Sequence, residues 1–277
     1  MDYATEFNPY GIDWSKLTLA DDFFFGYAMK NLDLCKEFLE MLLGTKISEI
    51  KHFKQQDYIK HSPSIHAVIL DVKLEADGRV INIEMQTTNR ADLPLRARYY
   101  QAATDIRLLP PGKSYSALPD FLTIFICTFD YFGKKKPVYT IRNTIQELEN
   151  EEFKDKRKIL VYNVTAYKEA FTSDLRDLLN FIKGGVPMFE RGKNFANNIG
   201  KIKTDAIFQE EYMDYYLKQR ELINDTIEKG LSIGIERGMQ QGAKLQKEKD
   251  DILLAQKDEL IRQLQARLEE AGLNSSL

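Results

Sequence analysis

Two carboxylates, Asp71 and Glu84, have the residue types and the spacing that predict chemistry in this chain. The segment between residues 67 and 86 reads AVILDVKLEADGRVINIEMQ, in which apolar and polar residues alternate as they do along β-strands. Asp77-Gly78 separates the two alternating runs, and Asp-Gly strongly favours a two-residue hairpin turn because both positions tolerate positive φ. The sequence therefore predicts a hairpin that brings the two carboxylates together.

The register of this hairpin is supported by its apolar pairs, which are Leu70 with Met85, Val72 with Ile83, and Leu74 with Ile81. The same register places Asp71 opposite Glu84, with Cβ atoms about 5 Å apart, where like charges destabilise a sheet. A divalent cation would remove that repulsion, because Mg²⁺ prefers oxygen ligands and is often held by one or two carboxylates and water. Gln86 and Lys73 lie on the same face. The alternative is an ordinary solvent-facing surface, on which Lys73 bridges Glu84 weakly.

The trio Asp71, Glu84 and Gln86 meets the requirements of phosphodiester hydrolysis. That reaction needs neutralised phosphate charge, an activated water and reactants held in line, and one or two Mg²⁺ ions can serve the first two needs. Two carboxylates and a backbone carbonyl form an open oxygen site, and a third polar side chain can orient the attacking water. Spacing alone does not separate this site from an exposed polar surface.

Composition predicts a soluble globular protein with one sizeable domain and an appendage, since 277 residues exceed an ordinary single domain. No stretch approaches about 18 consecutive apolar residues, so we expect no membrane span. The start of the chain lacks the pattern of a secretory signal. Cys35 and Cys127 lie in apolar stretches, and we interpret them as reduced core thiols in a cytoplasmic protein. His52, His61 and His66 have no metal-ligand spacing.

The net charge of −3 argues against a strongly basic nucleic-acid coat but allows local basic patches. One basic cluster spans residues 134–136, and another spans residues 154–158. Solvated loop charges are the simpler interpretation of both clusters.

Helices and strands are expected to alternate around one sheet over the first 185 residues, which predicts an α/β or α+β domain. The expected helices cover 17–43 (one helix or two, ending at Gly44), 95–109 and 174–182. Besides the hairpin, the expected strands cover 121–129, 138–142 and 158–162, and residues 47–58 are ambiguous.

The chain is expected to be helical and polar from residue 194 onward. Four glycines recur every fourth residue, at positions Gly230, Gly234, Gly238 and Gly242. They form either a bare stripe that another helix can approach or a flexible linker, since each interior glycine costs about 1 kcal/mol of helix stability. A near-heptad seam follows, made of Leu254, Ile261, Leu264 and Leu268 and interrupted by Lys257. It predicts a short coiled coil or a lone solvated helix, and we predict a homodimer through residues 226–270.

Several strings of this chain resemble one known family. NIEMQ (residues 82–86), with Asp71 upstream, is similar to a motif of the PD-(D/E)XK nuclease family transposases, also called the recombination-promoting nuclease (Rpn) family. The resemblance extends to ADDFFF at 20–25, RARYYQA at 96–102 and DFLTIFICTFDYF at 120–132, and it covers roughly residues 17–245. The glycine-containing tail is also common there.

The resemblance implies a restriction-endonuclease-like α/β core with a mixed sheet flanked by helices, followed by a C-terminal helical tail. The expected domains are 1–190 for the nuclease-like part, 191–229 for a helical extension and 230–277 for the glycine repeat and coiled coil. The implied function is that of a metal-dependent DNA endonuclease that promotes recombination or mobile-element activity. The alternatives are a nuclease-fold DNA-binding or regulatory protein with feeble catalysis, a phage-defence nuclease, and a structural interaction module.

The resemblance also implies roles for individual residues. Asp71 and Glu84 would ligate Mg²⁺ or Mn²⁺, with the Met85 carbonyl as a further ligand. Gln86 would stand where many superfamily members have the catalytic lysine, and Lys73 on the same face would supply the missing cation.

Further positions match the helices that flank the hairpin. Asp22 would add an acidic group near the metal, and Arg96 would contact the scissile phosphate, since bidentate recognition suits arginine. Tyr99 or Tyr100 accompanies Arg96 in the motif. Gly26 departs from the family, which more often has lysine there.

Overall fold

The structure, a computed structural model, describes residues 11–59 and 68–270, without the side chains of residues 52–59 and 68–70. His61 and His66 lie outside the described residues, and the side chains of His52 and Leu70 lie outside the described side chains. The α-helices are α2 (Asp22–Met29), α3 (Leu32–Leu43), α4 (Leu93–Leu108), α5 (Ser173–Ile182), α6 (Glu190–Lys203) and α7 (Ala206–Glu270). The strands are β1 (Ile50–Ile59), β2 (Val68–Ala76), β3 (Arg79–Gln86), β4 (Asp120–Cys127), β5 (Val138–Ile141), β6 (Thr144–Ile145), β7 (Glu151–Glu152) and β8 (Arg157–Asn163). Short 3₁₀ turns are η1 (Trp14–Lys16), η2 (Tyr115–Ala117), η3 (Gln146–Leu148) and η4 (Val164–Glu169).

A six-stranded mixed sheet forms the centre of the fold, in the order β1-β2-β3-β4-β8-β5. β3, β4 and β8 run parallel to one another, whereas β1, β2 and β5 are each antiparallel to their neighbours. The expected α/β class is confirmed. The ambiguous segment before the hairpin forms the edge strand β1.

The β2–β3 hairpin has the predicted turn and register. Asp77 and Gly78 both have positive φ, 49° and 73°. Val72 pairs with Ile83 and Leu74 pairs with Ile81, as the alternation predicts. The carboxylate of Asp77 also accepts the backbone N–H of Ser48 at 3.1 Å, so the turn is held against the chain that leads into β1.

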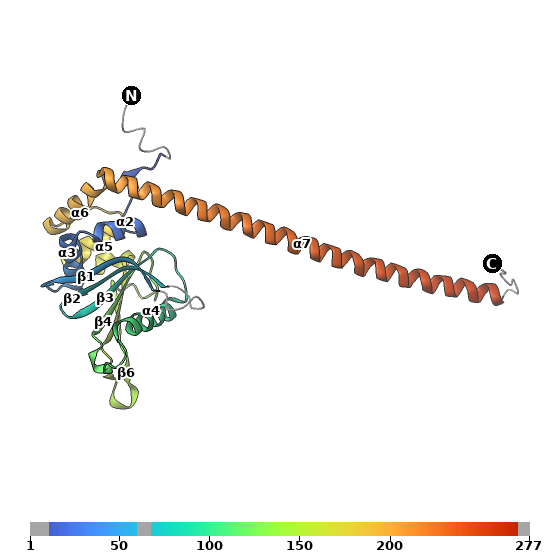
Figure 1. The fold of residues 1–277 in the computed structure, drawn as a ribbon, viewed down its shortest axis with the longest axis horizontal. Helices are drawn as coiled ribbons and strands as arrows, with labels where there is room; N and C mark the ends of the chain where they lie inside the picture. Colours follow the sequence, from blue (N-terminus) through green and yellow to red (C-terminus); the bar gives the residue numbers. More distant parts are fainter. Residues whose placement is uncertain (1–10, 60–67, 271–277) are drawn as a thin grey trace, which may run out of the picture. The chain divides into compact units, whose positions relative to one another are not determined.

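Helices α2, α3, α5 and α6 cover one face of the sheet (Figure 1). The apolar residues of the hairpin point into this main core, where they meet the phenylalanines of the helices. The largest fully buried side chains include Phe24, Phe25, Phe38, Phe195 and Phe208. This layer is therefore formed by helices from both ends of the first compact unit.

Helix α4 covers the other face of the sheet, on the opposite side from α2, α3 and α5 (Figure 1). Leu93 and Ala97 of α4 pack against Phe125 and Val161. The interpretation of the hairpin's polar side chains as a solvent-facing surface is therefore wrong for the polar residues of β3. The polar residues of β3 on this face are nearly inaccessible, with exposures of 0% for Asn82, 1% for Glu84 and 8% for Gln86.

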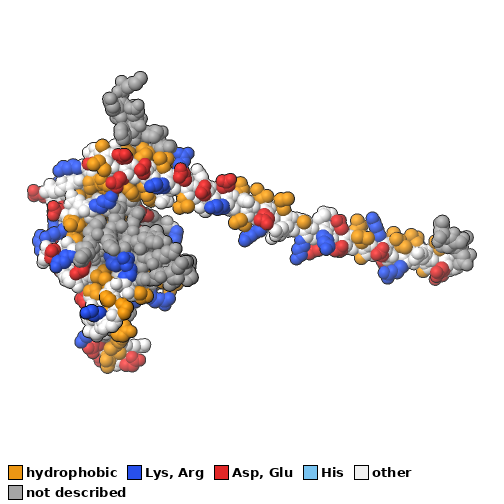
Figure 2. Space-filling view, viewed as in Figure 1, with side chains coloured by type: hydrophobic (Ala, Val, Ile, Leu, Met, Phe, Trp, Pro, Cys, Tyr) orange, Lys and Arg blue, Asp and Glu red, His pale blue; other side chains and the backbone are white. Residues whose placement is uncertain are grey.

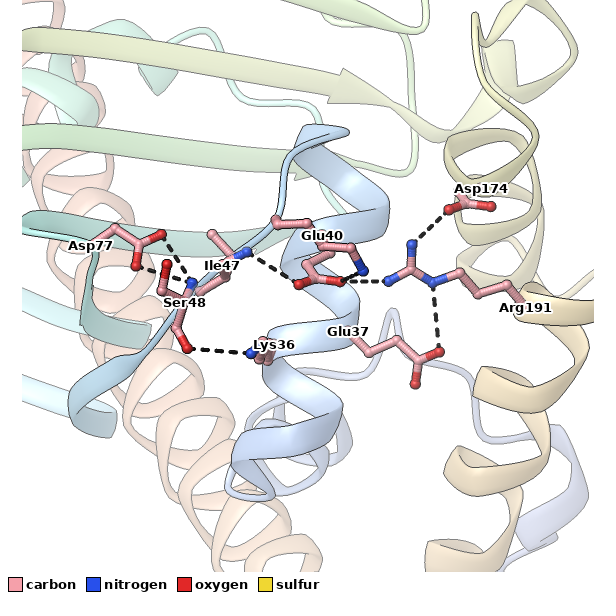
Figure 3. A network of polar contacts seen from close by, with 9 residues as sticks. Lys36, Glu37, Glu40, Ile47, Ser48, Asp77, Asp174 and Arg191 are labelled. Atoms are coloured by element: carbon pink, nitrogen blue, oxygen red, sulfur yellow. Dashed lines mark hydrogen bonds and ion pairs between the residues drawn. The ribbon is translucent and has the colours of Figure 1, made fainter.

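A polar network ties three helices of the main layer together (Figure 3). Arg191 of α6 donates to Asp174 of α5 and to the buried Glu40 of α3, both at 2.8 Å, and lies 3.8 Å from Glu37. Glu40 also accepts the backbone N–H of Ile47 at 3.1 Å. One guanidinium thus links α3, α5 and α6 above the sheet.

The chain packs as two compact units, Met1–Asp214 and Tyr215–Leu277. The first unit extends past the predicted limit at residue 190, because α6 buries Phe195 and Ile199 in the main core. The predicted boundary at residue 229 lies inside α7 and stays a prediction. From residue 218 to residue 270 every side chain is exposed. Within the described part of the chain, no helix combines the length and the apolarity needed to cross a membrane.

Candidate metal-binding site on the central hairpin

Glu84 lies near the carboxyl end of β3, beneath α4, with 1% of its surface exposed. The side-chain amide of Asn82, two residues earlier on the same strand face, donates to Oε1 of Glu84 at 3.1 Å. Nη2 of Arg96 lies 3.7 Å from the other oxygen, Oε2. Glu84 is therefore a buried carboxylate with an amide on one side and a guanidinium on the other.

Asp71 lies on β2, next to Glu84 on the neighbouring strand. Its Oδ2 accepts the backbone N–H of Met85 at 2.8 Å, a bond that reaches across the hairpin. The pairing of Val72 with Ile83 places Asp71, the residue before Val72, opposite the position of Glu84, the residue after Ile83. The sequence prediction that these two carboxylates meet thus agrees with the geometry of the hairpin.

Burial is the largest cause of the raised pKa of both carboxylates, Asp71 and Glu84. Burial raises the pKa of Asp71 to about 7, with a further upward contribution from Asp22. Burial and the nearby Asp71 raise the pKa of Glu84 well above its ordinary value. The N–H of Met85 and the charge of Arg96 lower the pKa of Asp71 without reversing the shift. The protein alone therefore lacks enough positive charge to keep both groups ionised at low cost.

The donor set of this site fits a hard divalent cation. Asp71 and Glu84 offer carboxylate oxygens, and Met85, whose N–H binds Asp71, offers a backbone carbonyl. That carbonyl accepts the Gln86 side-chain amide at 2.8 Å, which leaves it a second lone pair. Across residues 11–59 and 68–270, no group of three or more His, Cys, Asp or Glu side chains is arranged to hold a metal. A cation bound here would therefore complete its shell with water, as Mg²⁺ commonly does.

A chain of hydrogen bonds joins α4 to the carboxyl end of β3. Nη1 of Arg96 donates to Oε1 of Gln86 at 2.6 Å. Nε and Nη2 of Arg96 donate to the hydroxyl of Tyr100, one helical turn further along, at 3.0 and 2.8 Å. The guanidinium is therefore fixed on three sides, with Glu84 as its nearest carboxylate.

The sequence model of one protein family, described as PD-(D/E)XK nuclease family transposase, matches residues 22–226 of this chain. The chain belongs to this family. The match contains every residue of the site described above. Searches of curated proteins and of solved structures gave no match. The resemblance inferred from the sequence motifs is thus confirmed, and membership points to a nuclease or recombination-related function.

Asp22, a predicted accessory residue of this PD-(D/E)XK family member, begins α2. The preceding Asp21 caps the helix by accepting the N–H of Phe24 at 2.9 Å, and it also accepts the hydroxyl of Tyr212 at 3.0 Å. Burial raises the pKa of Asp22, and Arg96 partly offsets that rise. Since Asp22 in turn raises the pKa of Asp71, its carboxylate acts electrostatically on the site.

Two other predicted residues of the family site are Lys73 and Tyr99. Lys73 pairs with Asn82 across the hairpin, and its charge lowers the pKa of Asp105 on α4, which burial raises overall. Tyr99 is 40% exposed, whereas the neighbouring Tyr100 holds Arg96. The motif offered either tyrosine, and the geometry favours Tyr100.

Asn82 is the residue of the site to which sequence reasoning assigned no role. Alternation along β3 placed it on the same face as Glu84, and that was the available signal. Its amide contacts Glu84, while its own Oδ1 is buried and has no hydrogen-bond partner among the described atoms. Asn82 thus orients one oxygen of Glu84 from within the protein.

Proposed function

We propose that this chain is a metal-dependent DNA endonuclease that hydrolyses phosphodiester bonds, with Asp71 and Glu84 as metal ligands. The observation that carries the proposal is a pair of carboxylates on adjacent strands, with Glu84 buried and Asp71 half-buried and bonded to the backbone N–H of Met85. Such a pair is electrostatically costly without a cation, and its oxygens are the ligands that Mg²⁺ and Mn²⁺ prefer. Membership in a nuclease family supports this reading of the site.

In this proposal, other residues of the chain bind the phosphate and orient the attacking water. A bound Mg²⁺ supplies charge neutralisation and a water of lowered pKa. Arg96, fixed by Gln86 and Tyr100, presents a guanidinium beside Glu84, where it can bind a phosphate oxygen. Gln86 is neutral, so it orients water and Arg96 but takes no proton. Asp22 adds a further acidic group close to Asp71.

The neutral Gln86 also favours a second candidate function. In this second candidate the chain is a DNA-binding or regulatory protein that cleaves DNA only weakly, because no lysine occupies the position of Gln86. Lys73 on the hairpin is the candidate for the missing cation. An unchanged cleavage rate in Lys73→Ala would show that Lys73 does not have this role. The role in recombination or mobile-element activity rests on the family description.

Cleavage of supercoiled plasmid tests the proposal directly. We expect nicking by the wild-type protein with Mg²⁺ or Mn²⁺, no nicking in chelator, and at least a hundredfold slower nicking by Glu84→Ala. Glu75→Ala is the matched control, since Glu75 lies on the same hairpin opposite Val80, away from the site. Equal nicking by wild type and Glu84→Ala would contradict the proposal. DNA binding without nicking would favour the regulatory protein.

A thermal shift measures the metal site independently of cleavage. We expect Mg²⁺ or Mn²⁺ to increase the free energy of unfolding of the wild type by RT ln(1 + [L]/Kd). The Tm of the wild type should therefore rise. The shift should vanish in Glu84→Ala and persist in Glu75→Ala. A Tm that does not respond to either metal would favour a structural interaction module.

The second compact unit is the proposed dimerisation element. Hydrophobic side chains recur between charged ones along α7 (Figure 2), and all of them beyond residue 218 are exposed. The exposed set includes Leu254 at 57%, Ile261 at 52%, Leu264 at 51% and Leu268 at 43%. Isolated helices gain little from propensity alone, and packing of an apolar face supplies most helix stability. A partner helix from a second copy would cover this seam.

A further inference from the structure

A cavity of about 630 Å³ outside the carboxylate site is lined by an unusual concentration of lysines. Lys134, Lys135 and Lys136 come from the segment between β4 and β5, Lys168 comes from η4, and Lys183 follows α5. The only acidic side chain in the described lining is Glu169. Five positive charges and one negative charge therefore surround this space, although the whole chain carries a net charge of −3.

These five lysines have few contacts that offset their charge among the residues that the structure describes. Within the parts of the chain that the structure describes, none of them forms an ion pair with a carboxylate. Instead, Lys168 and Lys183 lie 6.0 and 5.4 Å from the centre of the Tyr167 ring. The aromatic ring thus gathers two ammonium groups at one wall of the cavity.

The loop that carries three of the lysines is held in place by its backbone. Asp130 accepts the N–H groups of Gly133 and Lys135 at 3.0 and 2.7 Å. The hydroxyl of Tyr139 donates to Asp130 at 2.9 Å and accepts the N–H of Lys134 at 3.2 Å. The lysine side chains are therefore displayed from a preorganised segment, which lowers the entropy lost on binding an anion.

The basic cavity lies at the same edge of the sheet as the carboxylate site. In the parallel strands Gln86 pairs with Cys127, and Cys127 pairs with Asn163, so the three strands end together. Two strand spacings, roughly 10 Å, separate Gln86 from Asn163. The lysine-bearing loop follows Cys127, and η4 begins directly after Asn163. Both the carboxylate site and the basic cavity therefore lie where β3, β4 and β8 end.

The second basic cluster of the sequence, at residues 154–158, lies at the opposite edge of the sheet and is used by the fold. Lys156 donates to the carbonyls of Leu118 and Ser116 at 2.9 and 3.4 Å. Arg157 opens β8 and pairs with Phe121 near the start of β4. Lys156 and Arg157 of this cluster therefore take part in the structure around the start of β4.

We propose that the basic cavity binds backbone phosphates of the DNA on one side of the bond to be cut. This inference rests on the proposed function, and it assigns Lys134, Lys136 and Lys183 to duplex binding and not to the chemistry. Lysine acts as a point charge toward phosphate, and each such contact releases counterions from the duplex. Binding through this cavity is therefore independent of sequence and dependent on salt.

Fluorescence anisotropy with a labelled duplex tests the inference in the full chain. All proteins carry Glu84→Ala so that the duplex stays intact, and chelator is present throughout. The test protein adds Lys134→Ala, Lys136→Ala and Lys183→Ala. The control protein instead adds Lys113→Ala, Lys154→Ala and Lys193→Ala, which remove the same charge from exposed positions elsewhere on the first unit.

We expect the test protein to bind duplex roughly tenfold or more weakly at 0.1 M salt, with a log–log salt slope smaller by about 2 to 3. The control protein should keep most of the affinity and the slope. Equal losses in both proteins would overturn the inference, as would no loss in either or no duplex binding at all. A lysine-dependent thermal shift with ATP, without any change in duplex affinity, would also overturn it and assign the cavity to mononucleotides.

These outcomes separate the inference from the proposed function. Plasmid nicking by the wild type, combined with unchanged duplex affinity in the test protein, would leave the endonuclease proposal intact and reject the basic cavity. Lysine-dependent duplex binding without nicking would support the cavity and reject the endonuclease.

Discussion

Arg96 donates a hydrogen bond of 2.6 Å to the side-chain carbonyl of Gln86, and Gln86 in turn donates its amide to the carbonyl of Met85 at 2.8 Å. The orientation of the Gln86 amide is therefore set from both ends. A residue at this position must accept a hydrogen bond from a guanidinium that also lies 3.7 Å from Glu84. That requirement explains why a neutral acceptor suits this chain where many superfamily members have lysine.

Replacing Gln86 with lysine should harm this protein. In Gln86→Lys an ammonium group meets the guanidinium of Arg96, and the acceptor for Nη1 is lost. We expect the free energy of unfolding to fall by about 1–3 kcal/mol and nicking not to accelerate. Urea unfolding and plasmid nicking measure the two effects. The double variant Gln86→Lys with Arg96→Gln should recover part of the stability, and a more stable or more active single variant would contradict the prediction.

Removing the amide of Asn82 should weaken metal binding. Asn82→Leu keeps the approximate volume but leaves Oε1 of Glu84 without its donor. We expect the Kd for Mn²⁺, measured by thermal shift, to rise about 10- to 100-fold, the usual effect of losing a group that orients a ligand. Thr104→Val is the control, because the buried hydroxyl of Thr104 has no partner among the described atoms. An unchanged Kd in Asn82→Leu would show that Glu84 needs no such orientation.

The metal-free protein should lose stability as the pH rises from about 4 to about 7. Burial holds the pKa of Asp71 at about 7 in the folded chain, whereas the ordinary value is 3.8. Between these values the folded state keeps a proton that the unfolded state has released, so the free energy of unfolding falls with rising pH. We expect the Tm in chelator to drop by several degrees over this range, and Asp71→Asn to flatten the curve. A Tm that rises from pH 4 to 7 and is unaffected by Asp71→Asn would contradict the assignment.

Dimerisation should depend on the exposed seam of α7. Truncation before Thr226 should convert a dimer of the full chain into a monomer, as measured by light scattering after size exclusion. Ile261→Asp should weaken the dimer, because it places a charge in the seam. Lys257→Leu should strengthen it, because it fills the position where the seam is interrupted. A truncated protein that remains dimeric would place the interface in the first unit.

The hairpin could be predicted from the sequence because its signals are local. Asp77-Gly78 fixes the turn, and the alternation around Val72 and Ile83 fixes the register. The cover of α4 over Glu84 could not be predicted in this way. It depends on the packing of Leu93 against residues of β4 and β8, which are remote in the sequence, and that packing turned a polar strand face into a buried site.

Helix α4 shows a second limit of sequence reasoning. Tyr99 and Tyr100 are adjacent in the motif, and consecutive residues on a helix point about 100° apart. The rotation of α4 on the sheet decides which tyrosine is turned toward Glu84, and that rotation follows from tertiary packing. The burial of Phe195 and Ile199 by α6 depends on tertiary packing in the same way, because α6 is polar in composition.

The hydroxyl of Tyr212 bonds to Asp21 across 191 positions of the chain. During synthesis the hairpin can form soon after it leaves the ribosome, since its pairs are close in sequence, but the bond that ties the capping residue Asp21 to α7 must wait for Tyr212. Asp22, which follows that cap, therefore reaches its final setting only when almost all of the family-matched region has been made. A nascent or prematurely ended chain carries Asp71 and Glu84 without the completed setting of Asp22, so assembly of the site is among the last events in the biogenesis of this protein.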